Sequence, residues 1–262
     1  DEVVLFEIDC SSIAEGFLSK SLHPRIMREV NGVLQEGLEP TQQIKGDEVH
    51  CPSTSSTKVA VALVSGGIDS PVAVARMLAQ GWIIYPLHGS LEPLTGDEAE
   101  RKTISCLRQL SNNNKLFQKN SNLVEKLFVI PIGDTLSLFT DKKMHRDYFV
   151  HMKRLLNVMA NRLAEEVGAT HIITGENIGQ VSSQTLGNLG AVERSSERPI
   201  LRPLLALDKV DIIHMAQALG TFEISTGPED CDIIGPNHPT TVADLRRLEE
   251  NEKDIGGLEE IV

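Results

Sequence analysis

The spacing of apolar residues changes character near residue 58. Before it, residues 3–8 predict one short strand. The stretch 51–57, CPSTSST, predicts a linker, because proline and small hydroxyl residues do not sustain a helix or strand. After it, short continuous apolar runs alternate with segments in which apolar residues recur every three or four positions. The runs predict four strands buried on both faces, at residues 59–64, 82–87, 127–132 and 172–173.

The helical segments are predicted from their spacing and their end signals. One face of a long helix is formed by Phe149, Met152, Leu156, Met159 and Leu163. This helix ends at Gly168, since glycine accepts the left-handed conformation of a helix end. Shorter helices are predicted over residues 72–79 and 98–110, and from Asp208 to Gly220. The segment 241–244 resembles a capping box in which Thr241 opens a C-terminal helix.

The order strand–helix–strand–helix predicts an α/β fold, a parallel twisted sheet with helices on both faces. We divide the chain into an N-terminal extension and linker (1–57), one α/β domain (58–240) and a C-terminal helical tail (241–262). In a sheet of this kind, ligands bind at the carboxyl ends of the strands. The loops that follow the predicted strands are therefore the places to look for chemistry.

Composition narrows the class of protein. The net charge of −12 opposes a broad nucleic-acid-binding face, which is usually basic. No apolar run reaches the roughly 20 residues of a membrane helix, and the first residues lack the basic and apolar pattern of a signal peptide, so we expect a cytoplasmic protein without a membrane partner. The cysteines, Cys10, Cys51, Cys106 and Cys231, include no CxxC pair, which argues against a zinc ribbon and a disulfide framework.

The loop after the first predicted strand has the composition of a phosphate-binding loop. Its sequence is Ser65, Gly66, Gly67, Ile68, Asp69 and Ser70. Glycines let the backbone approach a phosphate closely, and backbone N–H groups at a helix N-terminus attract anions. Asp69 fits an anion site if Mg²⁺ lies between it and the phosphates, so we assign it to that ion. The alternative is a tight turn with Ser70 as the N-cap. No Walker lysine is present.

A second polar segment, residues 174–185, follows the fourth predicted strand. Its sequence, TGENIGQVSSQT, is too rich in donors and acceptors to lie in the core. We expect it to form the second wall of a nucleotide site, with the candidate contacts Gly175, Glu176, Gln180 and Gln184. The alternative is a capped junction between a loop and a helix.

These segments together resemble the 4-thiouridine synthetase (ThiI) family, a family of PP-loop ATP pyrophosphatases with an adenine nucleotide alpha hydrolase-like fold. The resemblance rests on SGGIDS, on TGENIGQVSSQT, on LRPL at 201–204 with Asp208 and Lys209, and on PEDC at 228–231 before His238 and Pro239. It covers roughly residues 58–241. Five motifs in the same order make the resemblance specific for the catalytic domain of the family.

The resemblance implies a two-step reaction on tRNA, and a relation to thiamine biosynthesis. ATP first adenylates a uridine and releases pyrophosphate, and a sulfur nucleophile then displaces AMP. Lys209 matches a lysine of the family that helps with the developing charge. Cys231 matches the cysteine that takes part in sulfur transfer, as a persulfide carrier or as a disulfide partner; the alternative is an incidental loop thiol. The implied cofactors are ATP and Mg²⁺, and the catalytic residues are Asp69, Lys209 and Cys231.

Two further features are open to more than one interpretation. His88 lies at the predicted end of the second strand, where it would meet adenosine or form part of the strand end. The basic run at 142–146, KKMHR, together with Lys153 and Arg154, would face phosphates or form a solvated helix face.

The chain also departs from the family pattern. We expect 57 residues to be too few for both a ferredoxin-like and a THUMP domain, and roughly thirty residues after Cys231 to be too few for a rhodanese domain. The expected partners are therefore tRNA, bound directly or through a separate THUMP-type chain, a sulfur-donor protein, and a second copy in a homodimer. The alternatives are a stand-alone enzyme that adenylates another acceptor and a non-catalytic nucleotide-binding subunit.

Overall fold

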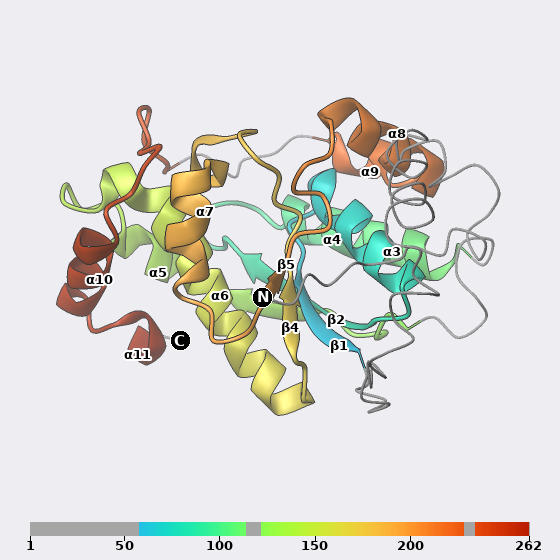
Figure 1. The fold of residues 1–262 in the computed structure, drawn as a ribbon, viewed down its shortest axis with the longest axis horizontal. Helices are drawn as coiled ribbons and strands as arrows, with labels where there is room; N and C mark the ends of the chain where they lie inside the picture. The colour runs from blue at the N-terminus through green and yellow to red at the C-terminus, as the bar shows by residue number, and fades with distance from the viewer. Residues whose placement is uncertain (1–57, 114–121, 228–233, 262) are drawn as a thin grey trace, which may run out of the picture.

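The computed structural model describes residues 58–113, 122–227 and 234–261. Five strands form one sheet in the order β3-β2-β1-β4-β5, and every neighbouring pair is parallel. The strands are β1 (Val59–Leu63), β2 (Ile83–Ser90), β3 (Phe128–Pro131), β4 (His171–Ile173) and β5 (Ile200–Leu201). Figure 1 shows the sheet at the centre of the molecule with helices around it. The α/β fold predicted from the sequence is confirmed.

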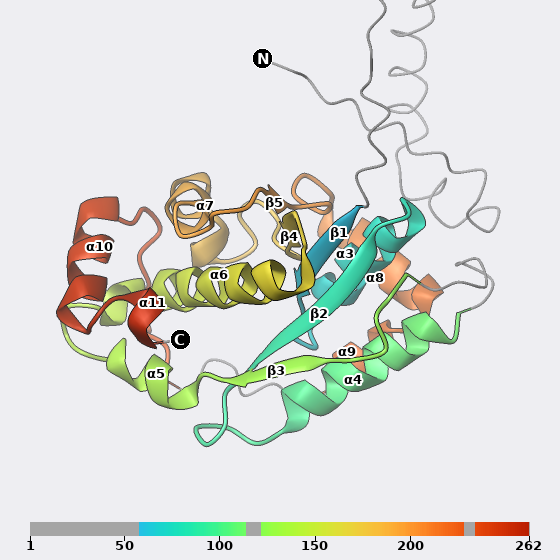
Figure 2. The same cartoon turned by 90° about the horizontal axis from the view of Figure 1, so that it is seen from below.

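Helices cover both faces of the sheet, as Figure 2 shows. One group packs beside α3 (Asp69–Ala79) and the other beside α6 (Tyr148–Val167). The remaining α-helices are α4 (Glu98–Ser111), α5 (Gly133–Leu138), α7 (Leu186–Glu193), α8 (Lys209–Leu219), α9 (Phe222–Ser225), α10 (Leu245–Asp254) and α11 (Leu258–Ile261). Short 3-10 helices lie at η3 (His145–Asp147) and η4 (Ser182–Gln184).

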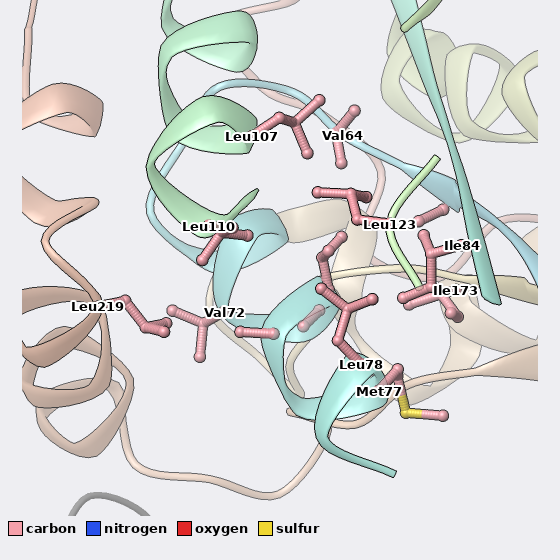
Figure 3. Packing of buried hydrophobic residues seen from close by; sticks show 14 of the residues in the cluster. Val64, Val72, Met77, Leu78, Ile84, Leu107, Leu110, Leu123, Ile173 and Leu219 are labelled. Carbon is pink, nitrogen blue, oxygen red and sulfur yellow. The ribbon is translucent and has the colours of Figure 1, made fainter. Parts of the chain in front are cut away.

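The period of two along β1 divides the core into two layers. Ala60 and Ala62 point to the layer beneath α3, α4 and α8, whereas Val61 points to the layer beneath α6. The first layer is drawn in Figure 3, where Val72 of α3 packs near Leu219 of α8. β1 is apolar along its whole length and buried at its centre on both faces, as the sequence predicted, whereas the edge strand β3 is partly exposed and the prediction of full burial was wrong there.

The predicted helix ends agree with the structure except at the last helix. Gly168 and Gly220 both adopt the left-handed conformation, with φ of 67° and 74°. The Asp208 side chain accepts a hydrogen bond from the Val210 amide. The capping box at 241–244 was wrong, because the N-cap of α10 is Asp244, whose carboxylate accepts from the amides of residues 246 and 247. A carboxylate next to the helix satisfies these amides without help from Thr241.

Two strand predictions also need correction. β2 does not end near residue 87 but continues to Ser90, because its last residues pair with β3. The strand β5 was not predicted, since Ile200 and Leu201 are too few to show a period. The predictions for residues 3–8, for the linker 51–57, and for Cys10, Cys51 and Cys231 lie outside the described residues.

The C-terminal helices pack against α6. Leu248 of α10 is fully buried beside Val150, and Leu258 of α11 joins the core layer beneath α6. Lys153 and Arg154 of α6 form buried or half-buried ion pairs, with Glu176 and Glu252. The expectation that these two side chains face phosphates or solvent is therefore wrong. No helix in the described part of the chain is long and apolar enough to cross a membrane.

Candidate functional site

The two polar segments singled out in the sequence follow neighbouring strands. The segment 65–70 follows β1, and the segment 174–185 follows β4, which pairs with β1 through Ala62 and Ile173. The chain builds the sheet outward from β1 to β3 on one side and from β4 to β5 on the other. The boundary between β1 and β4 is thus the topological switch point, and sheets of this kind bind their ligands there, at the carboxyl ends of the strands.

The loop 65–70 is held in a shape that only glycine allows at one position. Gly66 has a φ of 77°, and a Cβ atom there would lie 2.6 Å from the Ala99 carbonyl oxygen of α4. The Ser65 amide donates to the Ser70 hydroxyl oxygen at 3.1 Å, which closes the loop across the start of α3. The loop therefore leads directly into the N-terminus of an 11-residue helix, where an anion is favoured.

Gly175 brings the second segment into backbone contact with this helix start. A Cβ atom at Gly175 would lie 2.9 Å from the Ser70 nitrogen and 3.0 Å from the Asp69 carbonyl carbon. A side chain of any size would thus collide with the first turn of α3. The two segments form opposite sides of one site, and Gly175 is the point at which they meet.

Lys209 connects both segments from a third element. Its ammonium group donates to Asp69 Oδ1 at 2.5 Å and to Gln180 Oε1 at 3.2 Å. Lys209 is the first residue of α8, and its side chain is 41% exposed, whereas that of Asp69 is 23% exposed. The predicted residues Asp69, Lys209 and Gln180 therefore come together, and the Lys209 ammonium remains partly exposed.

Glu176 lies behind this site in a buried ion network. Lys153 donates to Glu176 Oε1 at 2.9 Å, and Arg202 donates to Oε2 at 2.8 Å. Burial alone would raise the pKa of the Glu176 carboxyl, but the two cations outweigh burial and hold the pKa below its ordinary value. Glu176 is thus ionised and turned toward protein groups, which makes it a support of the segment 174–185.

His88 is buried on β2 and contacts the end of β1, directly before the loop 65–70. Its Nδ1 lies 2.8 Å from the Val64 carbonyl oxygen, and because a carbonyl only accepts, Nδ1 carries the proton. Burial lowers the pKa of His88, although the Val64 carbonyl partly opposes this. A neutral histidine here fixes the end of β1 from which the loop 65–70 begins.

Other predicted residues occupy less direct places. Ile68 is partly buried against the core beneath α3, and Gly67 stands beside it in the loop. Gln184 folds its own segment, since its Oε1 accepts from the Asn177 amide at 3.0 Å. Asn177 in turn donates to the Leu207 carbonyl at 2.7 Å.

The comparisons identify the family. The family described as thiamine biosynthesis protein (ThiI) matches residues 55–256. The chain belongs to this family. The probable tRNA sulfurtransferase of Staphylococcus saprophyticus is 36% identical over 72% of this chain and 45% of its own length. That of Caldanaerobacter subterraneus is 35% identical over 75% of this chain and 50% of its own length.

A solved structure supports the assignment of this chain to the ThiI family. A 4-thiouridine synthetase in complex with RNA and ATP is 34% identical, with a TM-score of 0.68, over 78% of this chain and 53% of that chain. The chain thus spans about half the length of the curated relatives it matches. The family match at residues 55–256 includes all five strands and the segments 65–70 and 174–185.

Sequence reasoning missed several residues that shape the site in this ThiI member. Thr103 of α4 lies 3.4 Å from His88 Nδ1, and α4 also supplies the Ala99 carbonyl beneath Gly66. Arg202 was seen only as part of the LRPL motif, and Lys153 only as part of a basic run. One sequence signal could have pointed to Arg202 and Lys153. Glu176 follows an apolar strand closely, and a carboxylate buried at such a place needs cationic partners.

Proposed function

We propose that this chain is the adenylating part of a tRNA 4-thiouridine synthetase, which activates a uridine with ATP and then replaces its O4 by sulfur. The observation that carries the proposal is the meeting of the segments 65–70 and 174–185 at the switch point, with Lys209 and Asp69 between them. The 4-thiouridine synthetase that matches this chain binds ATP and RNA. A phosphate site without a Walker lysine fits cleavage between the α- and β-phosphates better than γ-phosphate transfer.

In the first proposed step, the uridine O4 attacks the α-phosphorus and the bond to the β-phosphate breaks. The uridine loses its N3 proton, and pyrophosphate leaves. Negative charge grows on the phosphate oxygens, so fixed donors and cations accelerate the step. We assign this stabilisation to the amides at the start of α3, to the Ser70 hydroxyl and to the Lys209 ammonium, which pairs with Asp69 in the first turn of α3.

Mg²⁺ is the metal that the proposal requires. Asp69 offers a partly exposed carboxylate beside the loop, and Mg²⁺ in nucleotide sites commonly takes one or two carboxylates together with substrate phosphates. The ion would neutralise the pyrophosphate that leaves. Since one Asp69 oxygen already bonds to Lys209, the same carboxylate would orient both cations.

In the second proposed step, a sulfur atom attacks C4 of the adenylated uridine and AMP leaves. The proposed carrier is Cys231 as a persulfide, charged by a sulfur-donor protein. The attack forms the C4–S bond and breaks the C4–O bond to AMP. A second thiol then cleaves the S–S bond to the tRNA and is oxidised with Cys231 to a disulfide.

Substitution of Cys231 separates the two steps. Cys231→Ser should still release pyrophosphate in the presence of tRNA, ATP and a persulfide donor, but should form no 4-thiouridine. Cys106→Ala is the matched control, because Cys106 is buried beside Ser225 and should be dispensable for both steps. Thiolation by Cys231→Ser at the wild-type rate would refute this role, as would loss of pyrophosphate release by that variant alone.

A further inference from the structure

Two consecutive residues of α6 enter two separate buried ion networks. Lys153 pairs with Glu176 on the candidate site, and Arg154 pairs with Glu252 on the C-terminal helix α10. The two acids are equally buried, at 4% and 5% exposed. Glu176 belongs to the segment at the candidate site, whereas Glu252 belongs to α10. The second network can therefore serve as a control for the first.

The first network spans three segments of the chain. Glu176 accepts from Lys153, from Arg202 and from the Thr174 hydroxyl, the last at 3.1 Å. Arg202 also donates to Glu193 at the end of α7, at 2.8 Å. The carboxylate thus fixes the segment after β4 to the end of the edge strand β5 on one side and to α6 on the other.

The second network lies away from the candidate site. Arg154 donates to both carboxylate oxygens of Glu252, at 2.7 and 2.8 Å, and to the Ala191 carbonyl. His151 lies 2.9 Å from the same carboxylate. This network holds α10 and α7 to α6 and touches none of the residues that line the site.

Stability alone does not account for the first network. Buried ion pairs gain little over well-packed apolar side chains, because each charge loses its hydration. In addition, Arg202 Nη2 is buried without a hydrogen-bond partner, which makes the network more costly. What the network does achieve is position: Glu176 follows Gly175, which touches the first turn of α3, and Gln180 of the same segment bonds to Lys209.

We propose that Lys153 and Arg202 are positioning residues for the nucleotide site, which act through the Glu176 carboxylate and do not touch ATP. They fix the segment 174–180 so that Gly175 stays against Ser70 and Gln180 stays within reach of Lys209. The inference rests on the proposed function, since it takes the switch point to be the ATP site.

The test compares Lys153→Met with Arg154→Met in the full chain. Each substitution replaces the cation that pairs with a buried acid, Lys153 being partly buried and Arg154 buried, by an apolar chain, and both should lower the melting temperature. Only Lys153→Met should weaken ATP binding, by about tenfold, because a displaced segment loses hydrogen-bond contacts near the charged phosphates, and one such contact is worth about that factor in affinity. Calorimetry measures the Kd, and Arg154→Met should stay within about twofold of wild type. Lys153→Arg, which keeps the positive charge, should retain most of the wild-type affinity for ATP.

Amide hydrogen exchange gives a readout that does not need ATP. Lys153→Met should speed exchange in residues 174–184, and Arg154→Met should speed it in α10 instead. If either methionine variant fails to fold, the isosteric pair Glu176→Gln and Glu252→Gln replaces it.

Three outcomes would overturn the positioning role. One is an unchanged Kd for Lys153→Met, another is an equal loss of affinity in both methionine variants, and the third is unchanged exchange in residues 174–184. A wild type that binds no ATP would instead contradict the proposed function, and the exchange data would then decide the positioning of the segment.

Discussion

Gly175→Ala tests whether the two segments must touch. The new Cβ would lie 2.9 Å from the Ser70 nitrogen and 3.0 Å from two further backbone atoms of α3. Ordinary contacts between such atoms are about 3.5 Å, so the segments must separate by roughly 0.5 Å. Overpacking of this kind costs about 1–3 kcal/mol, while the loss of glycine from the unfolded chain returns about 0.4–1 kcal/mol. We expect a net destabilisation of about 1–2 kcal/mol.

The substitution should also weaken ATP binding, because the atoms that must move belong to Asp69 and Ser70. Gly190→Ala in α7 is the matched control. A Cβ atom there meets nothing within 4 Å, so alanine should stabilise the helix by about 0.5–1 kcal/mol and leave ATP binding unchanged. Urea unfolding and calorimetry measure both effects. If Gly175→Ala were as stable as wild type and bound ATP equally well, the reasoning would be refuted.

Three further predictions follow from the buried titratable groups. The pKa of Glu176 lies below its ordinary value of 4.5, so its ion pairs stabilise the fold above that pH. This stabilisation is lost as the pH falls through the folded-state pKa, and the free energy of unfolding of Glu176→Gln should therefore depend less on pH below 4.5 than that of wild type. Burial lowers the pKa of His88 below 6.5, so stability should fall as the pH drops below that value, and His88→Gln should remove this part of the urea-midpoint profile. Burial raises the pKa of the Cys106 thiol, which should therefore resist alkylation in the native protein and react only on unfolding, as peptide mass mapping would show; rapid native labelling would contradict this.

The parts of the fold that the sequence predicted are those with a strong local signal. The apolar run of β1, the three- and four-residue spacing of α6, and the ends at Gly168 and Gly220 each report a local physical requirement. The two-residue strand β5 has no period of its own and exists because it pairs with β4. Likewise, α10 starts at Leu245 because the Asp244 side chain caps it, and Thr241, three residues earlier, offered a competing cap signal in the sequence.

The candidate site was predictable as two segments but not as a set of contacts. The motifs and the order of the strands predicted that the segments 65–70 and 174–185 lie together at the carboxyl ends of the strands. Nothing in the sequence joins Lys209 to Asp69, which are 140 residues apart. The expectation for Lys153 and Arg154 was wrong for a related reason. These two residues pair with Glu176 and Glu252, which come from distant elements, so local composition could not show the ion pairs.

The central claim is that ATP is cleaved between its α- and β-phosphates to activate tRNA. The most direct measurement follows α-³²P-labelled and γ-³²P-labelled ATP with the chain, Mg²⁺, a persulfide donor and tRNA that lacks 4-thiouridine, with products resolved by chromatography. The account predicts labelled AMP from the first and labelled pyrophosphate from the second, both dependent on tRNA. Asp69→Asn should slow their release at least about tenfold, since loss of one transition-state contact costs a few kcal/mol. Formation of ADP and inorganic phosphate would contradict the account.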